Sequence, residues 1–176
     1  NLVMDGLGAL MLGNEPAREK YMEERPRRRD ENIVDRAMLV QILFMGGWLT
    51  AVSFVFLKHP YFRGMFESDA QHLTAYFVLF ILSALFNGFN VRDEGYSVFS
   101  GLGENRAFLK VFFSIVLVQS AIVNAAMIPL DTFGWISRMF SCIPFGIAGW
   151  IAVILLAATM VPVDLMRKWV FRPISR

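Results

Sequence analysis

The sequence has little cysteine, little histidine and none of the common nucleotide or protease motifs. A single cysteine, Cys142, stands in an apolar run, which excludes a disulfide framework. The two histidines, His59 and His72, lack metal-ligand spacing. No phosphate-binding glycine loop on a strand–helix unit, no HExxH and no nucleophile elbow occurs, so we expect no nucleotide chemistry within these residues. The net charge of +2 gives no sign of a nucleic-acid partner.

Apolar residues dominate what is present. They make up 56% of the 176 residues, against roughly 45–50% in soluble domains, and phenylalanine alone occurs 17 times. The 17 basic and 15 acidic residues are crowded into a few short stretches, which leaves long runs without charge. No pattern of a cleavable signal peptide is visible. The composition therefore predicts an all-α, multi-pass bundle of about five transmembrane helices, the first of them truncated.

Four uncharged runs are long enough to cross a bilayer, because a spanning helix needs about 20 apolar residues. We predict membrane helices at about 38–57, 70–89, 108–128 and 139–163. A polar loop at 13–36 and a polar tail at 164–176 flank this region, and both are expected in the cytoplasm. Pro144 falls in the first turns of the last predicted helix, where it could kink the helix.

The first twelve residues form a shorter apolar segment that contains an acid, Asp5. Asn1 and Asp5 stand four residues apart, so on a helix their side chains share one face. A carboxylate in a hydrophobic span is costly and usually marks an ion or substrate path. Gly6 and Gly8 weaken the helical preference beside it and permit unwinding or close helix approach.

These features predict that Asn1 and Asp5 bind a metal cation. The alternative is an acid near a truncated helix end that lies in water or pairs with a basic group. One Asp and one Asn offer at most about three oxygens, whereas Ca²⁺ takes six to eight. The remaining ligands are therefore expected from helices outside this sequence.

The basic residues predict the orientation. The loops around 13–36 and 91–110 and the tail hold 14 of the 17 lysines and arginines, whereas only Lys58, Arg63 and Arg138 fall on the other side. The positive-inside rule then puts the C-terminus in the cytoplasm.

Other polar side chains within the spans are expected to form interhelical hydrogen bonds rather than to bind ions. They are Gln41, Thr50, Ser53, Asn87, Asn90, Gln119, Ser120 and Asn124. Cys142 is predicted to be a small buried residue, and Trp135 and Trp169 are placed as interfacial anchors.

Several short stretches resemble P-type cation-transporting ATPases, most closely the Ca²⁺-transporting pumps. The run Asn1-Leu-Val-Met-Asp5-Gly-Leu, followed by Glu15-Pro16 and Glu24-Arg25-Pro26-Arg27, resembles the sixth membrane helix and the loop after it. The run Leu85-Phe-Asn87-Gly-Phe-Asn90-Val-Arg92, then Val98-Phe99-Ser-Gly101-Leu with Asn105, resembles the eighth helix and its cytoplasmic loop, especially in the plasma-membrane type.

The resemblance implies that the chain holds helices six to ten of a ten-helix Ca²⁺-transporting ATPase, located in the plasma or bacterial inner membrane. Asn1 and Asp5 match the family's ion-ligating pair in helix six. ATP and Mg²⁺ would bind in cytoplasmic domains outside this sequence, so the segment alone should be inactive. Its partners would be the transported cation, the lipid bilayer, the N-terminal membrane helices and those domains.

Two positions depart from pumps that carry two ions. Met4 stands where such pumps have a threonine, and Ala84 where they have an acid, which favours one Ca²⁺ per cycle. Two alternatives remain open: a pump for Mn²⁺, Na⁺ or H⁺, and a fragment of a secondary transporter or channel that is not driven by ATP.

Overall fold

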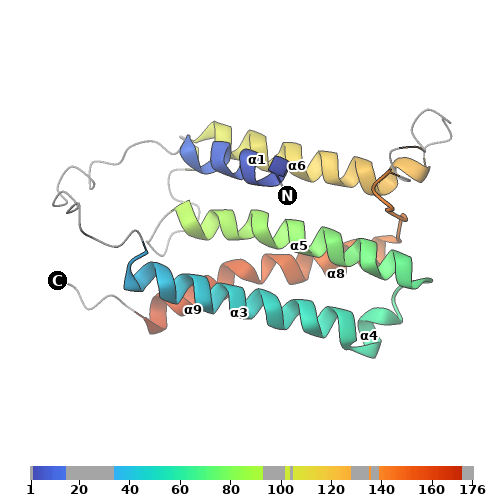
Figure 1. Cartoon of the computed structure of the whole chain (residues 1–176), viewed down its shortest axis with the longest axis horizontal. Coiled ribbons are helices and arrows are strands. Elements are labelled where there is room, and N and C mark those ends of the chain that lie inside the picture. The colour runs from blue at the N-terminus through green and yellow to red at the C-terminus, as the bar shows by residue number, and fades with distance from the viewer. Residues whose placement is uncertain are drawn as a thin grey trace.

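The computed structural model describes residues 2–14, 34–92, 102–103, 105–127, 135 and 139–171, with side chains from Gly6 onward. This described part contains helices and no strand. The elements in chain order are α1 (Leu2–Gly13), α3 (Arg36–Lys58), α4 (Pro60–Arg63), α5 (Asp69–Arg92), α6 (Arg106–Asn124), the 3-10 turn η1 (Ala125–Met127), α8 (Ile147–Ala158) and α9 (Met160–Val170) (Figure 1). The predicted all-α fold is confirmed.

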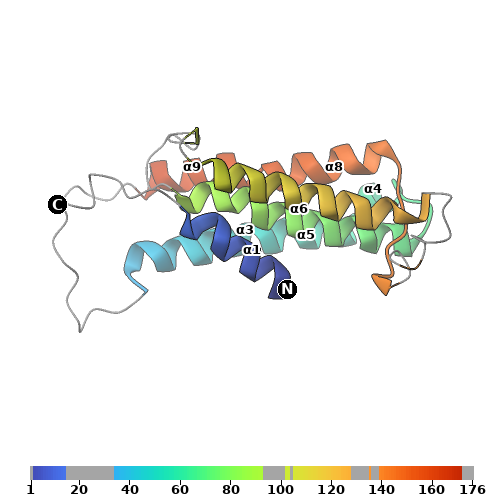
Figure 2. The same cartoon turned by 90° about the horizontal axis from the view of Figure 1, so that it is seen from above.

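Four helices are long and apolar enough to cross a membrane: α3, α5, α6, and α8 with α9 as one span over Ile147–Val170. They run alongside one another in both views of the bundle (Figures 1 and 2). The protein is therefore a multi-pass helical membrane protein, as predicted. The first three helices lie close to their predicted ranges, whereas the last begins at Ile147 and continues to Val170.

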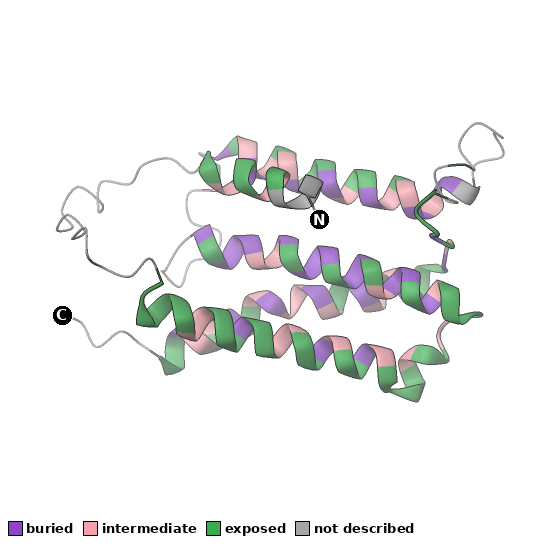
Figure 3. Cartoon of the chain, in the orientation of Figure 1, coloured by how far each residue is buried: buried purple, intermediate pink, exposed green. Residues whose placement is uncertain are grey.

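Helix α5 is the centre of the bundle. It contacts α1, α3, α4, α6, α8 and α9. In its most apolar window 61% of the residues are buried, against 11% in α3, which lies at the edge (Figure 3). Val78 and Leu79 are fully buried, and Phe56 of α3 belongs to the same core cluster. Apolar side chains around most of α5 thus fix the positions of its neighbours.

An irregular segment precedes α8, and Pro144 lies in it rather than in a helix. A proline disfavours helical conformation in the residue before it. Two side chains of α5 bind this backbone: Ile143 N donates to Thr74 Oγ1 at 3.1 Å, and Gln71 Nε2 donates to the Pro144 carbonyl at 2.9 Å. Non-helical backbone is tolerated at membrane depth only where protein or water satisfies its polar groups, so α5 stabilises this entry to the last span.

The last span is broken at Thr159, between α8 and α9. Pro162 has no N–H to donate to the carbonyl of Ala158, which explains a break at this point. The Thr159 hydroxyl donates to the Leu156 carbonyl at 2.6 Å and accepts a hydrogen bond from Trp48 Nε1 at 3.0 Å. The hydrogen bond from Trp48 therefore attaches the break between α8 and α9 to helix α3.

Candidate functional site

Asp5, one of the two predicted cation ligands, lies within helix α1. Its side chain, and the whole of Asn1, lie outside the described residues. Within the part of the chain that is described, no three His, Cys, Asp or Glu side chains come together as a metal site. Ligation by Asn1 and Asp5 therefore stays a prediction.

Helix α1, which carries the predicted ligand, is held against α6 and α5. Met11 is buried, and a Cβ atom on Gly88 of α5 would lie only 2.5 Å from Met11 Cε. A side chain at position 88 would therefore have to displace the flexible end of the Met11 side chain. By contrast, α1 continues as a regular helix through Gly6 and Gly8, and no atom lies within 4 Å of a Cβ built on either.

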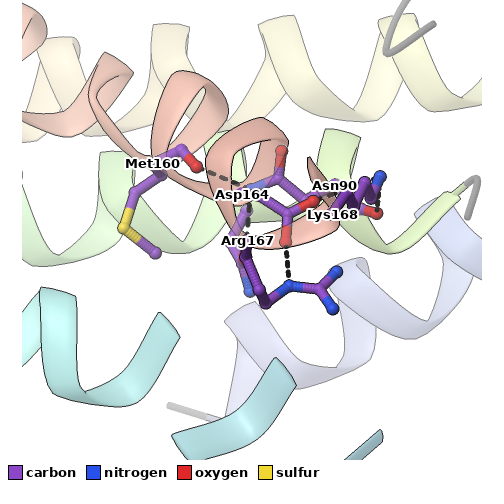
Figure 4. A network of polar contacts seen from close by, with 6 residues as sticks. Asn90, Met160, Asp164, Arg167 and Lys168 are labelled. Carbon is purple, nitrogen blue, oxygen red and sulfur yellow. Dashed lines mark hydrogen bonds and ion pairs between the residues drawn. The ribbon is translucent and has the colours of Figure 1, made fainter. Parts of the chain in front are cut away.

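The structure reveals a second acid in the bundle, Asp164, which the sequence placed at the start of the polar tail. It lies in α9 (Figure 4), and its residue is completely buried. Arg167 Nε lies 2.7 Å from Asp164 Oδ1, and Lys168 Nζ lies 3.1 Å from Oδ2 as an ion pair. The two cations are three and four residues further along the same helix, so both reach the carboxylate from the next turn.

This cluster joins α9 to the end of α5. Asn90 is buried, and its Nδ2 donates to the Met160 carbonyl at 2.9 Å and to Asn87 Oδ1 at 3.2 Å. In return, Lys168 Nζ donates to the Asn90 carbonyl at 3.4 Å. Carbonyls in the last turn of a helix carry partial negative charge, which favours a cation there. We refer to Asn90, Met160, Asp164, Arg167 and Lys168 as the polar clamp.

The polar clamp is suited to structure rather than to ion transport. Both carboxylate oxygens of Asp164 face positive charges, and one anion meets two cations. A metal cation would have to displace Arg167 or Lys168 to reach it. Sequence reasoning missed the clamp because it counted three charges near the end of the chain as a tail; their i, i+3 and i+4 spacing was the available signal.

Four of the residues that carry the family resemblance in the middle of the chain, Gly88, Asn90, Arg92 and Asn105, are buried at the same end of the bundle. The Arg92 guanidinium lies 4.8 Å from the centroid of the Phe108 ring, a cation–π contact. Asn105 caps α6, because its Oδ1 accepts a hydrogen bond from Phe108 N at 2.8 Å. The contact between Arg92 and Phe108 joins the end of α5 to the start of α6.

Other polar side chains form hydrogen bonds either between helices or within their own helix. Asn90 forms the predicted interhelical bond, whereas Thr50 and Asn124 donate to carbonyls of their own helices, Gly46 and Ser120. The buried His72 has its Nε2 2.9 Å from the Phe56 carbonyl, which is a hydrogen bond.

The two tryptophans predicted as interfacial anchors, Trp135 and Trp169, are both exposed in the structure. Cys142, predicted to be a small buried residue, is buried.

These features define a class of protein: a multi-pass helical membrane region whose helices are tied together by buried polar contacts at one end. Over residues 1–170 the chain matches the model of the family described as "Cation transporting ATPase, C-terminus". The chain belongs to this family.

Its relatives are long proteins with related names. It is 28% identical over 167 residues to "Plasma membrane calcium-transporting ATPase mca-1" of Caenorhabditis elegans, which covers 89% of this chain and 12% of the relative. With human "Plasma membrane calcium-transporting ATPase 4" it shares 30% identity over 162 residues, 86% of this chain and 12% of the relative. With "Probable calcium-transporting ATPase 6, plasma membrane-type" of Oryza sativa subsp. japonica it shares 31% identity over 166 residues. The match covers 82% of this chain and 16% of the relative. The chain thus spans about an eighth to a sixth of their length.

Proposed function

We propose that this chain is the C-terminal membrane region of an ATP-driven pump that exports Ca²⁺. The observation that carries the proposal is the family match over residues 1–170, together with relatives that are named as calcium-transporting ATPases. Four helices able to cross a membrane support it, since an ion pump needs a path through the bilayer. In this proposal ATP and Mg²⁺ bind in cytoplasmic domains that lie outside these residues.

Asn1 and Asp5 are the proposed ion ligands of this region. They contribute a carboxylate and an amide oxygen, at most about three of the six to eight oxygens that Ca²⁺ takes. The remaining ligands come from other membrane helices of the complete pump. The close packing of α1 on α5 at Gly88 supports this role, because it holds the ligand-bearing helix to the central helix of the bundle.

The proposed cycle alternates the access of this site. Phosphorylation in the cytoplasmic domains moves the ligand-bearing helices, so that the site opens to the outside and loses affinity. When Ca²⁺ leaves, a proton neutralises Asp5, because an uncompensated carboxylate is costly within the bilayer. The proton is released to the cytoplasm when the next ion binds.

Replacing Asp5 by Asn in the complete protein tests the proposal. We expect Ca²⁺-dependent phosphorylation by ATP to be lost, because the variant removes the only charged ligand that this region supplies. Phosphorylation from inorganic phosphate without Ca²⁺ should persist, which would show that the protein is folded. Asp69→Asn is the matched control, since it removes an exposed carboxylate that pairs with Arg63. Normal Ca²⁺-dependent phosphorylation in Asp5→Asn would refute the role of Asp5.

The ion and the number transported are tested separately. Met4 and the exposed Ala84 of α5 offer no carboxylate or hydroxyl oxygen, so we propose one Ca²⁺ per ATP hydrolysed. Parallel measurements of ATPase activity with Ca²⁺, Mn²⁺ and Na⁺, and across pH, would distinguish a Ca²⁺ pump from pumps for other cations. Transport that continues without ATP would instead identify a secondary transporter or channel.

We also propose that the C-terminus lies in the cytoplasm and that the protein resides in the plasma membrane, or in the inner membrane of a bacterium. Fourteen of the 17 basic residues on one side support this orientation. The relatives named as plasma membrane pumps support the location.

A further inference from the structure

Helix α1 is attached to the bundle chiefly through Met11. Of the α1 side chains that the structure describes, from Gly6 onward, Met11 alone is buried, at 3% exposure, whereas its neighbour Leu10 is 57% exposed. Met11 belongs to the hydrophobic core, against which Leu7 and Leu12 pack only partly buried. The position of α1 against α5 and α6 therefore depends largely on where the Met11 side chain lies.

Gly88 of α5 provides the space in which the end of Met11 lies. A Cβ atom on Gly88 would be 2.5 Å from Met11 Cε and 3.9 Å from Phe108 Cε2. Phe108 is held in place, because it is fully buried, with the Phe89 ring at a centroid distance of 4.8 Å and the Arg92 guanidinium over its face. A side chain at position 88 would therefore push the end of Met11 out of the core, or move Met11 and α1 together.

The contact between Met11 and Gly88 sets the depth of Asp5 in the bundle. Asp5 lies six residues before Met11 in α1, and a helical rise of about 1.5 Å per residue places it about 9 Å from this contact along the helix. Ca²⁺ takes its oxygen ligands at roughly 2.3–2.6 Å. A shift of α1 by a fraction of a helical turn would therefore carry a ligand on this helix out of binding distance.

We propose that Met11 and Gly88 are positioning residues of the proposed ion site: the Met11 side chain, packed on Gly88, holds α1 where Asp5 can bind Ca²⁺. This inference rests on the proposed function, since it concerns the proposed ligand of α1. Neither residue contacts the ion; both act through the placement of the helix. Glycine is unfavourable inside a helix, and this role accounts for the glycine at position 88.

The test measures phosphorylation of the complete protein by ATP over a range of Ca²⁺ concentrations. Gly88→Val should raise the Ca²⁺ concentration for half-maximal phosphorylation by roughly ten-fold, as the loss of a residue that supports a metal ligand does. Phosphorylation at saturating Ca²⁺, and from inorganic phosphate without Ca²⁺, should stay near the level of the unsubstituted protein. Gly88→Ala should shift half-saturation less and in the same direction, because its smaller side chain displaces only the flexible end of Met11.

A compensating variant combines Gly88→Val with Met11→Ala. Valine and alanine together have as many side-chain heavy atoms as glycine and methionine, so the double variant fills the same space. Each single change should weaken Ca²⁺ binding, and the double variant should bind Ca²⁺ more tightly than Gly88→Val alone, because residues in contact are coupled. If Gly88→Val is not phosphorylated from inorganic phosphate and is therefore unfolded, Gly88→Ala decides the test.

Gly149→Ala in α8 is the matched control for Gly88→Ala. A Cβ atom on Gly149 would lie 2.8 Å from a ring atom of Phe66 and of Phe145, so this glycine is also crowded, but by residues outside α1 and α5. It should lower the unfolding temperature and leave Ca²⁺ half-saturation unchanged. Unchanged half-saturation in Gly88→Ala, no recovery in a folded double variant, or an equal shift in Gly149→Ala would overturn the proposal. No Ca²⁺-dependent phosphorylation of the unsubstituted protein would instead overturn the proposed function.

Discussion

At the scale of single residues, His72 supplies a hydrogen bond that Pro60 cannot provide. Pro60 has no N–H, so the Phe56 carbonyl lacks the partner that a continuing helix would give it. His72 Nε2 lies 2.9 Å from this carbonyl and therefore donates to it. The Phe66 ring stacks on the imidazole with centroids 5.3 Å apart. A histidine that looked unsuited to metal binding thus has a structural role between α3 and α5.

Replacing His72 by Leu should lower the free energy of unfolding by about 1–3 kcal/mol, because a buried carbonyl loses its only described side-chain partner. His72→Gln, which retains an N–H donor, should lose less. Thermal unfolding of the purified protein in detergent measures both. His59→Leu is the control, since this exposed histidine accepts a 3.3 Å hydrogen bond from Tyr61 N and contacts the edge of the Phe62 ring, without a described contact to the Phe56 carbonyl. An equal loss in the Leu and Gln variants would show that ring packing, and not the hydrogen bond, matters.

The sequence predicted the burial of single residues better than it predicted which residues contact one another. It predicted that Cys142 is buried, because the apolarity of the surrounding residues is visible in the sequence. It gave no sign that His72 meets Phe56, since that contact depends on how two helices pack. Asn1 and Asp5 remain the sequence-based candidates for the ion site.

At the scale of helices, the polar clamp fixes α9 to the end of α5. Asp164→Leu should destabilise the protein by about 3–5 kcal/mol, because it removes the buried carboxylate that pairs with Arg167 and Lys168. Replacing all three by Leu should recover much of this loss, since apolar packing often substitutes for a buried ion cluster. Thermal unfolding of the purified complete protein measures each variant.

The exposed pair Arg63–Asp69 provides the comparison. Asp69→Asn should cost at most about 1 kcal/mol, as exposed ion pairs contribute little. If the triple replacement of the polar clamp lost as much stability as Asp164→Leu alone, the clamp would stabilise the fold through specific contacts rather than through charge balance.

The existence of the helices followed from uncharged runs, but the limits of the last one did not. Counting charges ended it before Asp164, whereas i+3 and i+4 pairing neutralises that acid and lets the helix continue to Val170. The start of this helix also lies further along the chain than predicted, at Ile147. An apolar run from residue 139 resembled a helix, yet Pro144, the hydrogen bond that Gln71 donates and the one that Thr74 accepts hold its first part irregular.

At the scale of the whole molecule, the bundle has a buried centre and an exposed edge. Helix α3 exposes apolar side chains such as Leu43 and Phe54, and no atom lies within 4 Å of a Cβ built on Gly46 or Gly47. Such a face suits lipid or further membrane helices, and small residues allow helices to approach closely. The relatives are six to eight times longer than the matched region, and we propose that further membrane helices of the complete protein occupy this face.

The orientation of the bundle can be tested on both ends at once. The start of α3 and the ends of α5 and α9 lie at one end of the bundle, and α4 lies at the other (Figure 1). The segments 13–36, 91–110 and 164–176, which hold 14 of the 17 basic residues, adjoin these helix ends in the sequence, so the positive-inside rule predicts that this end lies in the cytoplasm. In a protein with Cys142→Ser, an impermeant maleimide should label Ser68→Cys on intact cells and Val34→Cys only after permeabilisation. Both positions are exposed, so access to them depends on the side of the membrane. The reverse labelling pattern would show that the tail lies outside the cell. This orientation would contradict the proposed pump, whose phosphorylation uses cytoplasmic ATP.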